Sequence, residues 1–478
     1  MTIVSTSVRG PDRSMRFAAA WAPLSERLSW AARWRGIIAQ RRDELARVVS
    51  EEIGKTPFEA MSAEVLSLLE ACAFHERRAG RLLAERGLWG VPRLLCGGLG
   101  PFGLRQRVAP APLGRVGIIA TWNYPVGLLG VQVLQALLGG NRVVVKPSEL
   151  APRSLTMLME SAIDAGLPAG VLTSTAATRE AGPALLAEGG AGGSCPLDHL
   201  VFTGSTAVGR TIAAWGAANL VATTLELSGR DSAFVLDDAD AVLAAKSLWN
   251  GVTMHSGQTC MAPRRILVMP RAYEAFVAAL APLVAGAAPR RVISAAAAER
   301  CYDLCAQAAA SGGRSVTGVM ERPTGGDCRS LRPMAIVDCG AKTALARGEH
   351  FGPVVAVVAV RSLDEALAIH EECDQHLSCS LFTRKPGRVR ELVLRLGATN
   401  VLVNDSVLPT GSPAVGIGGV AASGWGMTRG AEGLMAMTRP VYVSQSGSRV
   451  RLPMMPPTPK EERALDWIVG LLHGRKRP

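Results

Sequence analysis

The sequence predicts an α/β protein built around parallel sheets, and two observations support this. From Arg115 onward, short apolar runs of strand length alternate with helical stretches, which is typical of βαβ units. The 478 residues are 48% hydrophobic and 19% charged, so the chain can bury a large core and extended disorder is excluded. Its length corresponds to roughly three domains at about 150 residues each.

Each element can be placed from its pattern of apolar residues. Residues 25–84 are expected to form long helices with charged faces, and residues 87–112 are rich in glycine and proline. Strands are expected in two series: first Val116–Ala120, Arg142–Val145, Val171–Ser174, His199–Phe202 and Phe234–Leu236, then Ile266–Met269, Val354–Val360, Ser380–Thr383 and Asn400–Val403. Helices are expected within the second series at Ala272–Ala285 and Leu363–His370, and a late strand follows at Met437–Ser444.

The net charge is +12, from 52 Lys and Arg against 40 Asp and Glu, which raises the question of nucleic-acid binding. The basic residues are spread along the chain without a stripe interleaved with aromatic residues, so we expect no nucleic-acid partner. Only seven of the 52 basic residues are lysines. Since Lys and Arg do different chemistry, each lysine is a candidate for a specific role.

The ten cysteines form no C-x-x-C pair and no Cys/His spacing typical of a zinc site, so we expect no metal. The first twenty residues contain three arginines and no apolar h-region, which argues against a secretory signal and favours a cytoplasmic protein. The apolar stretch 116–139 contains Asn123, Pro125 and two glutamines. A lipid-facing helix tolerates these residues poorly, so we expect a buried strand, a turn and a core helix there.

Three side chains are candidates for catalysis. Cys260 follows small and polar residues on a loop ahead of a strand, where a thiol is accessible, although an inert buried cysteine is the alternative. Glu226 lies between two leucines at a strand end, where burial would raise its pKa toward that of a general base; pairing with an arginine is the alternative. Asn123 could donate to a developing oxyanion or serve only as a turn residue.

Two turns are candidates for cofactor binding. Gly204, Ser205 and Gly209 lie between a strand and a helix, where the helix N-terminus attracts phosphate. Lys146 and Glu149 follow another strand, and ligands of open parallel sheets lie beyond the carboxyl ends of the strands. Taken alone, either turn could be an ordinary connection.

Six motifs occur in sequence: Trp122–Pro125, Lys146–Glu149, Phe202–Thr206, Leu225–Gly229, Gly257–Cys260 and Glu349–Val354. In this order they resemble the aldehyde dehydrogenase superfamily, over roughly residues 25 to 445. Trp122–Pro125 and Gly257–Pro263 look closest to the class 3-like branch of fatty and aromatic aldehyde dehydrogenases, which includes coniferyl-type bacterial enzymes.

The resemblance implies a role for each candidate residue. Cys260 matches the nucleophile, Glu226 the general base and Asn123 the oxyanion donor. The cofactor contacts that it implies are Lys146 and Glu149 at the adenosine ribose, Gly204, Ser205 and Gly209 at the pyrophosphate, and Glu349 and Phe351 at the nicotinamide side. Tyr124 is expected to line the substrate entrance.

The resemblance also implies the fold and its division. We expect a Rossmann-like parallel-sheet NAD(P)-binding domain in residues 1–228, with residues 94–119 contributing a β-hairpin of a small β oligomerisation arm. Leu104–Val108 and Arg115–Ile119 would pair in that hairpin. An α/β catalytic domain with the nucleophilic cysteine would follow in residues 229–433, then an oligomerisation strand in 434–450 and a C-terminal tail in 451–478.

The activity implied is NAD(P)-dependent oxidation of an aldehyde to the carboxylic acid. It would proceed through a thiohemiacetal and a thioester on Cys260, hydride transfer to nicotinamide, and hydrolysis by water that Glu226 activates. Glu149 should repel a 2′-phosphate, which favours NAD, with NADP also open. A coenzyme-A-acylating enzyme and a non-catalytic scaffold are the alternatives. Ser228 and Arg230 stand where Gly and Lys are usual in the family, so the aldehyde itself is left open.

The resemblance further implies a homodimer or a tetramer, assembled through the arm. In the tail, Glu461–His473 is expected to form a short helix with apolar residues on several faces, followed by the basic end Arg475–Arg477. About thirteen residues are too few to span a bilayer. The helix packs on its own subunit, gates the substrate mouth or makes weak peripheral membrane contact.

Overall fold

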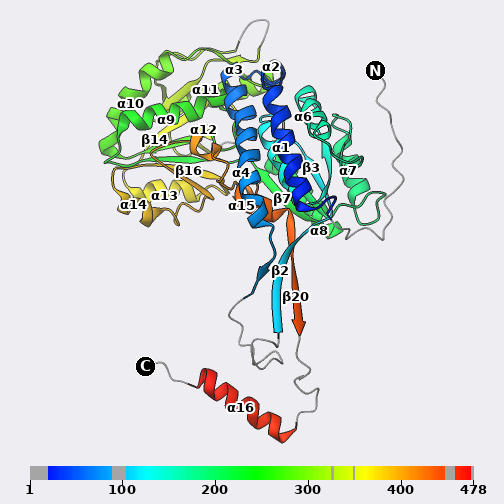
Figure 1. Ribbon diagram of the computed structural model, residues 1–478. Helices are drawn as coiled ribbons and strands as arrows, with labels where there is room; N and C mark the ends of the chain where they lie inside the picture. The colour runs from blue at the N-terminus through cyan, green and yellow to red at the C-terminus, as the bar shows by residue number, and fades with distance from the viewer. Residues whose placement is uncertain (1–19, 89–103, 324–327, 348–349, 447–457, 475–478) are drawn as a thin grey trace, which may run out of the picture. The chain divides into compact units, whose positions relative to one another are not determined.

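The computed structural model describes residues 20–88, 104–323, 328–347, 350–446 and 458–474 (Figure 1). The chain divides into two compact units. The first unit is Met1–Leu82 with Pro112–Arg439, and the second is Leu83–Ala111 with Pro440–Pro478. Among the described helices, none combines the length and the apolar character needed to cross a membrane.

The first unit contains a six-stranded sheet in the order β19-β7-β6-β3-β4-β5. Its strands are β3 (Arg115–Ile119), β4 (Arg142–Lys146), β5 (Leu172–Ser174), β6 (His199–Gly204), β7 (Ala222–Leu227) and β19 (Gly424–Trp425). All are parallel except β19, which runs antiparallel to β7. The chain extends the sheet from β3 to β5 and then crosses to β6 on the other side of β3. Such a reversal opens a crevice at the carboxyl ends of the strands, where ligands bind.

Helices cover both faces of this sheet. They are α5 (Gly127–Leu138), α6 (Pro152–Asp164), α7 (Ala181–Gly189), α8 (Thr206–Asn219) and the N-terminal group α1 (Leu24–Gln40), α2 (Arg42–Ile53), α3 (Pro57–Glu59), the π-helix η2 (Ala60–Leu66) and α4 (Ser67–Leu82). Trp30 and Trp34 of α1 are fully buried, and their indole N–H groups donate to the Ala162 carbonyl and the Ser161 hydroxyl of α6. These bonds join α1 to α6, one of the helices that cover the sheet.

A second sheet of the same unit has seven strands in the order β11-β13-β14-β9-β8-β16-β17. The strands are β8 (Ser232–Val235), β9 (Arg265–Val268), β11 (Arg314–Ser315), β13 (Met334–Val337), β14 (Val354–Ala359), β16 (Ser378–Phe382) and β17 (Asn400–Val403). All are parallel except the edge strand β11. The sequence placed Phe234–Leu236 with the first series, but β8 lies between β9 and β16, because pairing in a sheet is not set by order along the chain.

Both faces of the second sheet are apolar, so successive residues of a strand enter different cores. Val355 and Val357 of β14 pack with α9 (Ala241–Thr253) and α10 (Pro270–Ala285). The neighbouring Val354, Ala356 and Val358 pack with helices that cover the opposite face. These helices are α11 (Ala295–Ala310), α12 (Ala344–Arg347), α13 (Leu363–Glu371) and α14 (Pro386–Leu392).

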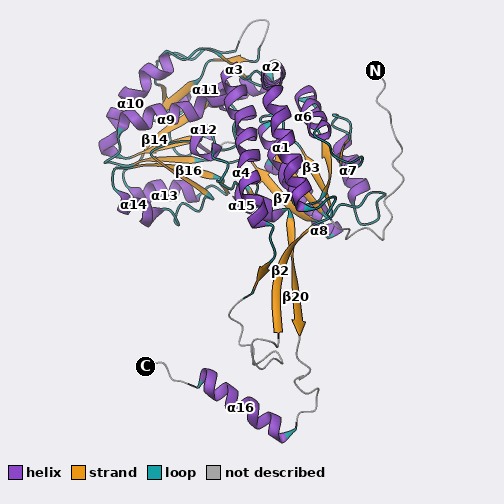
Figure 2. Cartoon of the chain, viewed as in Figure 1, coloured by secondary structure: helices purple, strands orange, loops and turns teal. Residues whose placement is uncertain are grey.

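The second unit contains a three-stranded sheet in the order β1-β2-β20 (Figure 2). Its strands are β1 (Arg86–Gly87), β2 (Leu104–Pro112) and β20 (Thr438–Ser446), and a terminal helix α16 (Pro459–His473) follows. The expected hairpin between residues 104–108 and 115–119 is wrong. β3 pairs with β4 and β6 in the six-stranded sheet, because its apolar residues Val116 and Ile118 are fully buried there.

Candidate active site

Cys260 lies on a loop between the short 3-10 helix η3 (Met254–Gly257) and β9. Three successive residues of η3 have left-handed backbone: His255 with φ 46°, Ser256 with φ 57° and Gly257 with φ 69°. That conformation costs a residue with a side chain about 1–2 kcal/mol. Only glycine fits at 257, because a Cβ there would collide with the carbonyl of Gly352. Strain of this kind is typical of functional loops.

The surrounding structure holds the cysteine loop in this conformation. The buried guanidinium of Arg264 donates to the carbonyls of Gly257 and Thr259, at 3.0 and 2.7 Å. Glu59 of α3 accepts from the backbone N–H of His255 at 2.9 Å. The loop is therefore held by Arg264, which follows the thiol in the chain, and by Glu59 of the N-terminal helices.

Cys260 and Glu226 line the same cavity of about 630 Å³. Much of the wall is apolar and includes Phe58, Leu66, Leu128, Met254, Leu377 and Ile417. Thr203, Tyr124 and Arg429 are among the polar residues of the wall. An apolar cavity with a few convergent polar groups is the usual form of a small-molecule site.

Burial sets the protonation of both reactive groups. It raises the pKa of Cys260 to about 12, and the charges of Glu226 and Asp231 act in the same direction. The thiol is therefore protonated at neutral pH. Burial raises the pKa of Glu226 to about 7, against the opposing effects of the Arg429 charge and the Thr203 hydroxyl. A carboxyl group with a pKa near 7 is suited to accept and release a proton.

Two hydroxyl groups orient the Glu226 carboxylate. The Thr203 hydroxyl donates to its Oε2 at 3.3 Å, and the Thr428 hydroxyl donates to its Oε1. Glu226 is the penultimate residue of β7, and its partner in β19 is Gly424. The carboxylate thus stands at the carboxyl end of a central strand of the six-stranded sheet, while the thiol comes from the loop that precedes β9.

Asn123 lies in the turn between β3 and α5 and is buried. Its amide Nδ2 donates to the Gln258 carbonyl at 3.0 Å, and its Oδ1 accepts from the Thr121 hydroxyl. An amide nitrogen carries two N–H groups, and the hydrogen bonds of the described residues use one of them. The structure therefore brings Asn123 to the cysteine loop.

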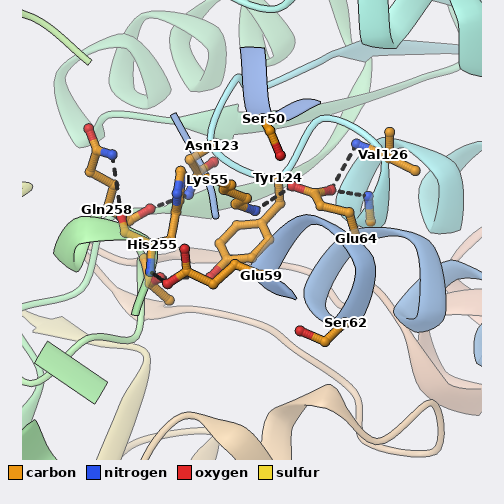
Figure 3. Close-up of polar contacts among 12 residues, drawn as sticks. Ser50, Lys55, Glu59, Ser62, Glu64, Asn123, Tyr124, Val126, His255 and Gln258 are labelled. Atoms are coloured by element: carbon orange, nitrogen blue, oxygen red, sulfur yellow. Dashed lines mark hydrogen bonds and ion pairs between the residues drawn. The ribbon is translucent and has the colours of Figure 1, made fainter. Parts of the chain in front are cut away.

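A buried ion pair supports the turn that carries Asn123 and Tyr124 (Figure 3). Lys55 and Glu64 are paired with both side chains fully enclosed. Glu64 also accepts from the backbone N–H groups of Val126 and Gly127, at the start of α5. The Lys55 ammonium lies 3.5 Å from the centre of the Tyr124 ring. Burial lowers the pKa of Lys55 and raises that of Glu64, and the attraction within the pair opposes both shifts.

Tyr124 connects this pair to the cysteine loop. Its hydroxyl shares a 2.7 Å hydrogen bond with the hydroxyl of Thr259, the residue before Cys260. Its ring is half-buried and lines the cavity, as expected of a substrate-side residue. Figure 3 shows the ring between the Lys55–Glu64 pair and the η3 segment with His255.

The residues expected at the adenosine ribose and the pyrophosphate lie at the carboxyl edge of the six-stranded sheet. Lys146 ends β4, and its ammonium binds Glu149 at 2.8 Å. This hydrogen bond holds the pKa of Glu149 below its usual value. Ser205 is the N-cap of α8, where its hydroxyl accepts from the Val208 N–H. Gly209 lets α8 pack closely, because a Cβ there would lie 2.5 Å from the Leu227 side chain.

These residues fit a dinucleotide. An ammonium and an exposed carboxylate suit ribose hydroxyls, and the N-terminus of a fourteen-residue helix suits a diphosphate. Phe351 packs edge-on against Trp122, with ring centres 5.9 Å apart. Glu349, the remaining predicted contact, lies outside the described residues.

Four further residues belong to the site and were not identified from the sequence: Lys55, Glu64, Thr428 and Arg429. Two signals in the sequence lie next to these residues. Lys55 is one of only seven lysines in the chain. The residues that follow it, Thr56–Glu59, have the Thr-x-x-Glu pattern of a capping box, which marks the start of a helix. Thr428 and Arg429 lie in the glycine-rich run 416–433. Only the antiparallel pairing of β19 with β7 brings that run to Glu226.

Comparison with known proteins identifies the family of the chain. The profile of the aldehyde dehydrogenase family matches residues 13–443. The relatives include coniferyl aldehyde dehydrogenase of a Pseudomonas species, 30% identical over 367 residues (74% of this chain and 75% of the relative). Geranial dehydrogenase of Castellaniella defragrans is 30% identical over 438 residues (88% of this chain and 86% of the relative).

Solved structures share the fold. Lactaldehyde dehydrogenase from Escherichia coli superposes with a TM-score of 0.80 at 26% identity, covering 89% of this chain and 88% of that one. The match of the family profile spans both sheets and every described residue of the candidate site. The chain belongs to the aldehyde dehydrogenase family and is an oxidoreductase that acts on aldehydes.

Proposed function

We propose that the enzyme converts an aldehyde with an apolar body to the carboxylic acid through a thioester on Cys260. The observation that carries the proposal is the cavity itself, whose wall holds the thiol and a carboxyl group with a pKa near 7. The apolar wall favours aldehydes such as those named for the coniferyl and geranial relatives.

The first stage forms a bond between the sulfur and the aldehyde carbon. The Cys260 thiol must lose its proton to solvent before its sulfur attacks, which leaves Glu226 ionised for the second stage. Attack gives a thiohemiacetal, whose oxyanion accepts from the free N–H of Asn123 and from the Cys260 backbone N–H. A nicotinamide cofactor held at Lys146, Glu149 and the N-terminus of α8 would supply the acceptor for the hydride that leaves this carbon.

The second stage releases the product. Loss of the hydride leaves a thioester on Cys260, and water must attack its carbonyl. Glu226 takes the proton of that water, and the thiol departs with a proton as the acid forms. Because a base stands beside the thioester, hydrolysis is favoured over transfer to coenzyme A.

We further propose that NAD is preferred over NADP. The ionised Glu149 is exposed beside Lys146 and would accept from a free ribose 2′-hydroxyl. A 2′-phosphate would meet its negative charge. The nine described cysteines are free thiols, which fits our proposal of a cytoplasmic location.

The test follows cofactor reduction with a panel of apolar aldehydes, with NAD or NADP, with and without coenzyme A. We expect acid as the product, no dependence on coenzyme A, and no turnover in Cys260→Ala. Cys195→Ala removes a partly exposed thiol outside the cavity and should behave as wild type. A requirement for coenzyme A supports the acylating alternative, and inactivity of the wild type on every aldehyde supports the scaffold.

A further inference from the structure

Arg264 is a buried arginine that lies directly before β9, and only 1% of its surface is exposed. Its backbone N–H donates to the Asp231 carbonyl at 2.9 Å, and its own carbonyl accepts from the Ala356 N–H at 3.3 Å. Asp231 comes directly before β8, and Ala356 lies within β14. The arginine is therefore anchored in the seven-stranded sheet, which gives its side chain a rigid base.

The guanidinium of Arg264 binds two carbonyls of the cysteine loop. Nη1 donates to Gly257 at 3.0 Å, and Nη2 donates to Thr259 at 2.7 Å. Nη1 also lies 3.5 Å from the Gly352 carbonyl, and the guanidinium carbon is 5.4 Å from the centre of the Phe351 ring. One side chain thus joins the cysteine loop to the segment that is expected beside the nicotinamide.

The carbonyl of Thr259 belongs to the same peptide group as the N–H of Cys260. A peptide group is planar and trans, so its N–H points away from its C=O, and Arg264 on the carbonyl fixes the direction of the N–H. Burial raises the pKa of Cys260 to about 12, and this N–H is among the groups that oppose the shift, because it faces its own sulfur. Among the described residues, no other residue accepts from it. An aldehyde bonded to the sulfur would bring its oxygen to this N–H.

The charge of Arg264 adds to this geometry. A short hydrogen bond from a charged donor polarises the peptide that accepts it, and the N–H of that peptide becomes a stronger donor. The other expected oxyanion donor is tied to the same loop, because Asn123 donates to the Gln258 carbonyl at 3.0 Å. A neutral donor would be enough to hold a loop, and a guanidinium is costly to bury. The charge itself therefore points to a function at the peptide.

We propose that Arg264 is a positioning residue of the oxyanion site, which aims and strengthens the Cys260 N–H that holds the oxygen of the thiohemiacetal. This rests on the proposed function, since it assumes an adduct on Cys260. Arg264 acts through the Thr259–Cys260 peptide and does not touch the substrate. Reactions that place negative charge on the oxygen should therefore depend on Arg264 more than other reactions of the same thiol do.

The experiment compares two reactions of Cys260 at one pH. Iodoacetamide alkylates the thiol without forming an oxyanion, whereas the burst of aldehyde oxidation passes through one. Mass spectrometry of the Cys260 peptide measures the alkylation rate, and the ratio of burst to alkylation cancels any change in the ionisation of the thiol. In Arg264→Met and in Arg264→Gln, this ratio should fall about 30-fold, somewhat less than the loss of a whole oxyanion donor. An unchanged ratio in either variant refutes the proposal, because Arg264 would then act on the thiol or the fold alone.

Arg265→Met is the matched control, because it removes the buried guanidinium of the next residue. The acceptors of Arg265 lie outside the cysteine loop and are the Ser232 hydroxyl and the carbonyls of Ala346 and Arg230. The ratio in this variant should stay near that of wild type. A fall as large as that in Arg264→Met would overturn the assignment to the Thr259 carbonyl.

A second readout needs no turnover. An unbranched trifluoromethyl ketone adds to the thiol and leaves an oxyanion on a carbon that has no hydride to lose, and its Kd follows from protection of Cys260 against iodoacetamide. We expect this Kd to rise about 30-fold in Arg264→Met and Arg264→Gln and to stay unchanged in Arg265→Met. Equal affinity in Arg264→Met and wild type overturns the proposal. If wild type binds the ketone but oxidises no aldehyde, the proposed function fails while the role of Arg264 stands.

Discussion

At the scale of single residues, the site depends on the pKa of Glu226, which burial and the neighbouring groups shift in opposite directions. Burial would leave Glu226 protonated, while the Arg429 charge and the Thr203 hydroxyl favour its ionised form. The balance places the pKa of Glu226 near 7. At neutral pH the group is therefore divided between the form that accepts a proton and the form that returns it.

This balance predicts the pH dependence of turnover. Since only ionised Glu226 accepts a proton from water, the steady-state rate of wild type should rise about tenfold per pH unit below 7 and level off above it. Glu226→Gln should show a burst of reduced cofactor followed by a slow steady state that is flat across this range. Stopped-flow absorbance separates the two phases. If burst and steady state slow equally, Glu226 acts before the thioester rather than after it.

At the scale of elements, two contacts between segments hold the site together. The π-helix η2 carries Glu64 to the start of α5, and π-helical turns occur frequently at functional sites. The helix α8 packs on β7 through Gly209 and Leu227. The first contact positions the turn with Asn123, and the second positions the N-terminus of α8.

The buried pair predicts strong coupling between Lys55 and Glu64. Lys55→Met leaves the Glu64 carboxylate enclosed without its cation, so the free energy of unfolding should fall by about 3–5 kcal/mol. The double variant Lys55→Met with Glu64→Leu should lose less stability than the sum of the single changes. Denaturant titration of the four proteins measures this coupling. Strict additivity would show that the two groups act independently.

The contact of α8 with β7 predicts a specific loss of cofactor binding. In Gly209→Val the new side chain meets Leu227, so the helix must move away from the sheet and carry its N-terminus with it. We expect KM for NAD to rise at least tenfold, with a smaller rise in Gly209→Ala. Gly182→Ala is the control, because no atom lies within 4 Å of a Cβ at that position. An unchanged KM in Gly209→Val would separate α8 from the cofactor.

At the scale of the whole molecule, the second unit presents an edge strand and a helix with exposed apolar side chains. In the sheet β1-β2-β20, the nine-residue strand β20 is an edge. A long exposed edge is a template for pairing with another chain. In α16, Leu465, Trp467, Val469 and Leu471 are all exposed. We therefore propose a homodimer or a dimer of dimers assembled through this unit.

Light scattering at micromolar concentration should give two or four times the mass of the chain. Val443→Pro removes a backbone N–H from β20 and should shift the mass toward the monomer, while Val443→Ala should not. A monomeric wild type at that concentration would contradict the assembly.

The helix α16 supports a second prediction at this scale. Its exposed Trp467 and apolar neighbours match an interfacial helix, although the predicted basic end Arg475–Arg477 lies outside the described residues. If the tail contacts membranes, full-length protein should sediment with anionic liposomes at low salt, and a chain ending at Pro457 should not. If both stay in the supernatant, the tail is a packing element of the assembly.

The sequence by itself determined the fold class, the positions of most strands, and the motifs that identify the family. Periodicity and turn residues are local, so they can be recognised without the folded chain. Cys260, Glu226 and Asn123 could be named because each stands in such a local motif. Tertiary structure alone decided which strands pair, and it moved β3 from an expected hairpin into the six-stranded sheet. It also decided that Lys55 meets Glu64 and that Arg429 meets the aldehyde cavity. The physical reason is that burial and charge pairing join residues far apart in the chain, and no local pattern records such contacts.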